Sequence, residues 1–179
     1  MRTFDPSRPR APVAGGPRAG RTPEVVASVG IADTSRMREV VRSALVGHSA
    51  AQVYALIVDV ERYPEFLPWC DGAEVESRAG SEMVASLSIR RGPLRTRFAT
   101  RNRLDPGRSL AMTLERGPFR TLEGLWTLEP LGEDGCKVQL RMRFEFAAGV
   151  AGALLEPLFE ETAGSLVDAF VARARDVYG

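Results

Sequence analysis

The stretch LRTRFATRNRL, residues 94–104, alternates between two kinds of side chain. Every second residue is uncharged, and these residues are Leu94, Thr96, Phe98, Thr100, Asn102 and Leu104. The positions between them hold Arg95, Arg97, Ala99, Arg101 and Arg103. Because successive side chains of a β-strand point to opposite faces of the sheet, the stretch predicts a strand with an uncharged inward face and a basic outward face.

The segments on either side repeat this period of two. We expect further strands near residues 73–78, 82–91, 109–116, 119–129 and 136–147, and a first strand over residues 38–46. Turns rich in Gly and Pro separate them, such as Arg91-Gly92-Pro93 and Asp105-Pro106-Gly107. Connections this short join antiparallel neighbours, so the sequence predicts a seven-stranded antiparallel sheet.

Helices are expected at two places in the chain. Ser49 and Gln52 form the capping-box pattern that begins a helix, and Asp59 is placed to cap a second short helix running into Tyr63. Apolar residues at helical spacing predict a long helix over residues 150–178. Pro157 lies inside it, so either this helix bends or its first turn is a separate piece. Only this helix is long enough to cover the apolar face, which predicts an α+β fold with the sheet curved around it.

The inward face of the predicted sheet is not uniformly bulky. Thr96, Thr100, Asn102 and Gly124 interrupt its apolar side chains. An inward Asn without a partner is costly in a solid core, whereas a pocket with a few polar groups accommodates it. We therefore predict an internal pocket, although small polar residues near strand ends also reach solvent or backbone groups.

The outward face collects positive charge. Its candidate residues for binding RNA phosphates or anionic lipid headgroups are Arg90, Arg95, Arg97, Arg101 and Arg103. The preceding strand presents Ser86 and Ser88 outward, so we expect it to supply few acidic partners. The simpler interpretation is a solvated strand face that discourages aggregation at sheet edges.

Residues 1–36 differ in composition from the rest of the chain. They hold six of the 24 basic and three of the 23 acidic residues, which leaves residues 37–179 with a net charge of −2. This Arg-, Pro- and Gly-rich segment has no structural periodicity, and we expect it to be disordered. Three alternatives remain: an organelle transit peptide, a basic arm, or translation that truly starts at Met37. Residues 37–179 are expected to form one domain.

The segment DVERYPEFLPWC, residues 59–70, is too apolar for a free loop and too rich in Pro for a long helix. We interpret it as a lid over one end of the pocket, with Tyr63, Phe66, Leu67 and Trp69 packed inward. The other residues expected to line the pocket are Phe98, Met112, Trp126, Phe144 and Phe159.

This segment resembles the signature of the coenzyme Q-binding, START-like family, which includes bacterial ribosome-association toxins. Further similarities are Gly117-Pro118-Phe119, the strand from Leu122 to Trp126, Cys136, and Phe144-Glu145-Phe146. The resemblance implies a helix-grip fold with a hydrophobic tunnel, spanning residues 38–178. It implies ubiquinone or a related isoprenoid lipid as ligand and, for some bacterial members, binding to the large ribosomal subunit that blocks subunit joining. Pro157 departs from the family pattern.

Catalytic and metal-binding patterns do not stand out in this sequence. His48, the only histidine, lies beside the Ser49 cap, where a loop residue is the ordinary interpretation. Cys70 and Cys136 fit no metal spacing. We therefore expect a non-enzymatic binder of ubiquinone that supports respiration, without a catalytic cofactor. The alternatives are a ribosome-association inhibitor and, third, a cyclase-like enzyme on an apolar substrate. A cytoplasmic location is expected, with peripheral contact at the inner membrane surface, or a mitochondrial one if residues 1–36 are a transit peptide.

Overall fold

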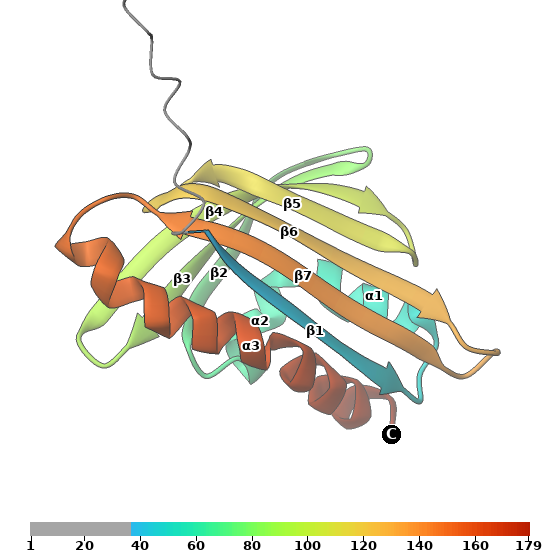
Figure 1. Ribbon diagram of the computed structural model, residues 1–179. Coiled ribbons are helices and arrows are strands. Elements are labelled where there is room, and N and C mark those ends of the chain that lie inside the picture. The colour runs from blue at the N-terminus through green and yellow to red at the C-terminus, as the bar shows by residue number, and fades with distance from the viewer. Residues whose placement is uncertain (1–36) are drawn as a thin grey trace, which may run out of the picture. The chain divides into compact units, whose positions relative to one another are not determined.

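The computed structural model describes residues 37–179 (Figure 1). The expected disorder of residues 1–36 falls outside this range, so it stays a prediction. For Arg91 and residues 150–152 the structure describes the backbone alone.

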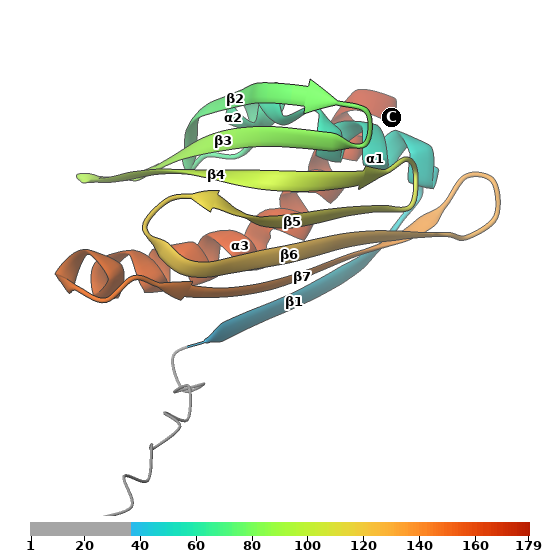
Figure 2. The same cartoon turned by 90° about the horizontal axis from the view of Figure 1, so that it is seen from above.

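Seven strands form one antiparallel sheet in the order β1-β7-β6-β5-β4-β3-β2. They are β1 (Arg38–Val46), β2 (Cys70–Ala79), β3 (Glu82–Arg91), β4 (Leu94–Asp105), β5 (Ser109–Arg116), β6 (Phe119–Pro130) and β7 (Cys136–Phe146). Strands β2 to β7 are joined by consecutive hairpins, and β1 closes the order by pairing with β7 (Figure 2). The predicted sheet is therefore confirmed, with β2 beginning three residues earlier than expected.

The turn before β6 depends on a glycine. Gly117 has a φ of 150°, and a Cβ built there would lie 2.5 Å from the Cβ of Phe98. A side chain at this position would therefore meet both backbone strain and a steric clash. Its absence lets the turn lie directly against Phe98.

The helices follow the predicted order, with one difference in the second. Helix α1 (Ala50–Val58) begins with the expected capping box, in which Gln52 N–H donates to the Ser49 hydroxyl and the Gln52 side chain accepts from Ser49 N–H. A 3₁₀ turn, η2 (Val60–Arg62), and the short helix α2 (Tyr63–Phe66) then take the place of one helix ending at Tyr63. Asp59 makes no side-chain cap to η2, because α1 runs directly into the 3₁₀ turn.

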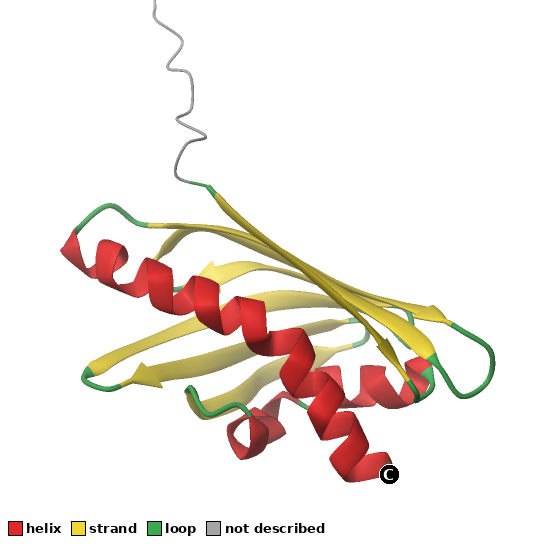
Figure 3. Ribbon diagram, turned by 60° about the horizontal axis from the view of Figure 1, so that its bottom comes forward, coloured by secondary structure: helices red, strands yellow, loops and turns green. Residues whose placement is uncertain are grey.

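Helix α3 (Val150–Tyr178) is continuous through Pro157 and lies across the inward face of the sheet (Figure 3). Along this face its side chains Leu155, Phe159, Leu166 and Phe170 are buried. Two links tie it to the edge strand β1: Arg38 pairs with Glu156 at 2.6 Å, and Arg42 donates to the carbonyl oxygen of Gly164 at 3.3 Å. The helix-grip arrangement expected from the sequence is therefore confirmed.

Candidate functional site

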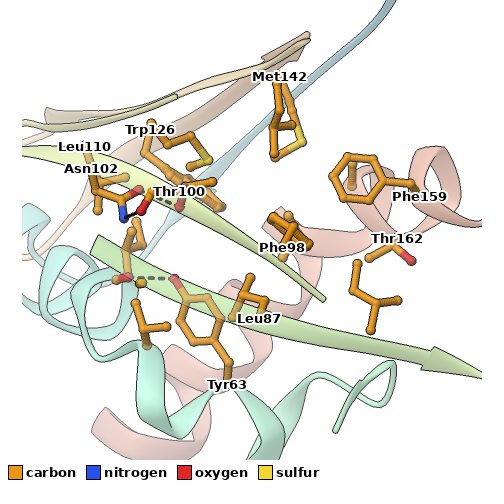
Figure 4. A pocket seen from close by; sticks show the side chains of 18 of the residues that line it. Tyr63, Leu87, Phe98, Thr100, Asn102, Leu110, Trp126, Met142, Phe159 and Thr162 are labelled. Carbon is orange, nitrogen blue, oxygen red and sulfur yellow. Dashed lines mark hydrogen bonds between the residues drawn. The ribbon is translucent and has the colours of Figure 1, made fainter. Parts of the chain in front are cut away.

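An internal cavity lies between the inward face of the sheet, helix α3 and the segment η2–α2 (Figure 4). Its free space amounts to about 70 Å³. Because one enclosed water needs roughly 10–15 Å³ of such free space, the cavity has room for a few waters. Its wall is almost wholly apolar, and Tyr63 is its one titratable side chain.

Six of the nine predicted pocket residues line this cavity: Tyr63, Trp69, Phe98, Met112, Trp126 and Phe159. The other three do not. Leu67 and Phe144 are buried in the core, and Phe66 packs edge-on against Tyr63 and Phe170. Phe144 packs against Phe159 with its ring centroid 4.8 Å away, so it supports the cavity wall from behind.

Part of the cavity wall was not predicted from the sequence. Strand β3 contributes Met83, Ala85, Leu87 and Ile89. The period of two was available as a signal, because outward Ser86 and Ser88 imply inward odd-numbered neighbours. Helix α3 adds a second group, which consists of Thr162, Ala163, Leu166 and Phe170.

The inward Asn102 is satisfied by hydrogen bonds. Its side-chain amide donates to the carbonyl oxygens of Met83 and Thr100, both at 3.1 Å, and its amide oxygen accepts from the Thr100 hydroxyl at 3.1 Å (Figure 4). The buried amide therefore forms a closed polar cluster on the cavity wall.

Tyr63 is also engaged within the protein. Its hydroxyl donates to the carbonyl oxygen of Ile57 at 2.6 Å (Figure 4). Burial raises the pKa of this hydroxyl well above its usual range. Tyr63 thus ties α2 to the last turn of α1. Because its hydroxyl proton is engaged in this hydrogen bond, it is not available to a ligand.

The wall is adaptable because it holds flexible side chains. Met83, Met112 and Met142 all border the cavity, and they are the three methionines that follow residue 37. Methionine is unbranched and fills irregular space in several conformations. A Cβ on Gly124 would lie 2.7 Å from Cγ and Sδ of Met112, so the glycine provides the space in which Met112 rests.

Trp69 and Thr162 line both the cavity and an outer depression of about 280 Å³. The depression lies between the segment before β2, the end of β3 and helix α3. Trp69 is half-buried. These two side chains therefore form the thin part of the wall between the cavity and the surface.

The predicted basic stripe is largely paired with acidic groups. Arg97 pairs with Glu74 of β2 at 2.8 Å and donates to the buried Ser86 hydroxyl at 2.7 Å. Arg101 binds Glu115 of β5 through two hydrogen bonds of 3.1 Å. Strand β3 supplies one acidic partner, Glu82 to Arg101, as expected of the preceding strand. The other partners come from β2 and β5 and were not predicted from the sequence.

Other arginines on this face carry more available charge. Within residues 37–179, Arg95, Arg103 and Arg143 form no ion pair, and Arg90 lies 3.6 Å from Asp71. The cross-strand pairing places Arg103 in one row with Arg141, which lies 4.0 Å from Glu39, and Ala111 and Leu125 separate the two arginines. The face therefore mixes available arginines with small and apolar residues.

Other reactive groups lie apart from the cavity. The ring centroids of His48 and Tyr178 lie 5.7 Å apart. Burial raises the pKa of the Cys70 and Cys136 thiols. Within residues 37–179 there is no cluster of His, Cys, Asp and Glu that could hold a metal ion. No helix in the same range is both long and apolar enough to cross a membrane.

Known proteins resemble this chain in both sequence and fold. The ribosome association toxin RatA of Pseudomonas aeruginosa is 46% identical over 138 residues, which cover 77% of this chain and 96% of that protein. The mitochondrial coenzyme Q-binding protein COQ10 homolog B of Xenopus laevis is 28% identical over 149 residues, which cover 81% of this chain and 61% of that protein. The crystal structure of the Zhui aromatase/cyclase from Streptomyces sp. R1128 superposes with a TM-score of 0.69 at 22% identity, covering 78% and 94%.

The last of these similarities concerns the fold alone. The two sequence relatives confirm the resemblance inferred from the lid segment and the strands around it. Residues 46–171 match the family described as polyketide cyclase / dehydrase and lipid transport, and the chain belongs to that family.

Proposed function

We propose that this protein associates with the ribosome and acts there by binding. One observation carries the proposal: a relative 46% identical over almost its whole length is named a ribosome association toxin. The proposed target is the large ribosomal subunit, and the proposed effect of binding is interference with the joining of the two subunits. In the cavity wall only Tyr63 is titratable, which offers little for general acid–base catalysis by a cyclase-like enzyme.

The outer face of the sheet is the proposed ribosome contact. RNA binding depends on cations that are free to approach phosphates. Arg103 and Arg143 meet this condition, whereas Arg101 already holds Glu115. Arg103 of β4 and Arg143 of β7 are separated by three strand spacings, or at least about 14 Å, so the face could contact more than one phosphate.

The test is co-sedimentation of the full chain with purified ribosomal subunits in sucrose gradients. Arg103→Glu should weaken co-sedimentation and reduce the salt dependence of binding by about one unit of logarithmic slope. Arg175→Glu is the matched control, because it makes the same charge change at an exposed position of helix α3. Equal loss in both variants would remove the outer face as the contact, and no co-sedimentation of wild type would remove ribosome association itself.

We propose binding of ubiquinone or a related isoprenoid lipid as a second candidate. The enclosed apolar wall supports it, together with the 28% identical coenzyme Q-binding relative. A quinone ring needs more room than about 70 Å³, so binding requires the cavity to expand. Rearrangement of Met83, Met112 and Met142 provides a low-cost route, because their side chains have several accessible conformations.

Fluorescence titration with a solubilised ubiquinone tests this candidate. Trp69→Ala should weaken binding by about 1–3 kcal/mol, or roughly ten- to hundredfold, if the ring contacts the lid. Tyr178→Ala is the control, because this half-buried aromatic side chain does not line the cavity. Unchanged affinity in folded Trp69→Ala would exclude the lid as the ring contact, and no binding by delipidated wild type would exclude the ligand.

A further inference from the structure

Two arginines lie directly opposite each other where β3 and β4 meet in a hairpin. The strand register pairs Arg90 with Arg95. Asp71 lies 3.6 Å from Arg90, but no acidic partner within residues 37–179 pairs with Arg95. Like charges on directly opposite residues destabilise a strand pair. An external anion at this hairpin would relieve that repulsion.

The hairpin borders the depression outside the cavity. Pro68, Trp69 and Arg90 line one side of this depression, and Leu158, Glu161, Thr162 and Ser165 of α3 line the other. Trp69 is amphipathic and half-buried, which suits the boundary between water and an apolar phase.

An exposed apolar side chain continues this surface along α3. Leu154 is 56% exposed and lies one helical turn before Leu158, which is buried beside the depression. Residues four apart share a helix face, so Leu154 extends the apolar wall outward. All three ribbon views place the N-terminal end of α3 and the β3–β4 hairpin at the same end of the sheet (Figures 1, 2 and 3).

We propose that this end of the domain, formed by Trp69, Arg90, Arg95 and Leu154, docks on an anionic lipid bilayer. The two arginines bind headgroup phosphates, while Leu154 and Trp69 enter the interfacial layer. Leu154 and Trp69 distinguish this surface from an RNA contact, because an exposed leucine contributes nothing to phosphate binding. The proposal goes beyond ribosome association and does not depend on it.

Flotation of the full chain with lipid vesicles tests the docking surface. Wild type should float with vesicles of phosphatidylcholine and phosphatidylglycerol in equal parts, should float far less with phosphatidylcholine alone, and should be released by salt. Each arginine near an anionic surface contributes about fivefold to partitioning, so the double variant Arg90→Gln, Arg95→Gln should bind about 25-fold more weakly. Leu154→Asp should lose about tenfold.

Matched variants separate this surface from general effects of charge and polarity. The double variant Arg103→Gln, Arg143→Gln removes the same charge from the middle of the outer face, and Leu45→Asp alters a leucine that is 73% exposed on β1. Both should float like wild type. Quenching of tryptophan fluorescence by brominated lipid should disappear in Trp69→Phe, because Trp126 is buried in the core.

The results of these experiments separate the docking surface from an RNA contact and from ribosome association. No flotation, equal flotation with neutral vesicles, or equal loss in the matched variants would overturn the docking surface. If the Arg90, Arg95 variant lost ribosomal co-sedimentation and kept vesicle binding, these arginines would be an RNA contact instead. Absent flotation with intact ribosomal co-sedimentation would reject this inference and leave the proposed function standing.

Discussion

Gly124→Ala tests whether the cavity absorbs a displaced side chain. The new methyl carbon would lie 2.7 Å from Cγ and Sδ of Met112, a distance at which one of the two must move. The backbone of β6 is held by ladders to β5 and β7, so the side chain of Met112 moves. The Met112 side chain can move into the adjacent cavity, which has about 70 Å³ of free space.

The expected magnitude follows from two opposing effects. A strained methionine conformer costs about 0.5–1.5 kcal/mol, and replacing glycine by alanine within a strand recovers about 0.5–1 kcal/mol. The free energy of unfolding should therefore fall by less than about 1 kcal/mol. At the same time, Met112 fills the cavity, so an apolar fluorescent probe that binds there should lose at least roughly tenfold in affinity.

Urea unfolding followed by far-ultraviolet circular dichroism measures the first quantity, and probe titration measures the second. A destabilisation of more than about 2 kcal/mol would refute the reasoning, because it would show overpacking without free space for Met112. Met112→Ala in the Gly124→Ala background is the control. It should restore probe binding, and the double-mutant cycle should show coupling between the two positions.

Three further predictions concern other parts of the molecule. The buried Tyr54 hydroxyl has no hydrogen-bond partner within residues 37–179, so Tyr54→Phe should leave the thermal midpoint unchanged or raise it; a loss of several degrees would reveal a partner such as a bound water. Glu65 binds Arg62 and Arg173, which hold its carboxyl pKa below the usual range. Its contribution to stability is therefore complete above about pH 4.3 and lost as the pH falls through the lowered pKa, so urea unfolding of wild type and Glu65→Gln should converge at acidic pH; a gap that widens there would contradict this. A protein of residues 37–179 should keep the thermal midpoint and ribosomal co-sedimentation of the full chain, and loss of either would show that residues 1–36 contribute to folding or binding.

Local patterns in the sequence determined the elements and the faces they present. The alternation over residues 94–104 placed Phe98, Asn102 and Leu104 inward, because side-chain direction along a strand follows from the backbone geometry of adjacent residues. The capping box at Ser49 located the start of α1 for a similar reason, since both of its hydrogen bonds join residues three apart. Both predictions held because their physical cause lay within a few residues, whereas the expected side-chain cap at Asp59 did not form.

Only the tertiary structure decided what each of these side chains meets. The partner of Arg97 is Glu74, two strands away, and Arg101 is held by Glu115 on the neighbouring strand. The sequence placed Tyr63 in the lid, but only the path of η2 decides that its hydroxyl donates to the carbonyl oxygen of Ile57. Phe144 and Phe159 were indistinguishable as pocket residues until packing placed one behind the other. These outcomes depend on strand register and on how α3 crosses the sheet, which are set by many weak contacts between distant residues and leave no local pattern in the chain.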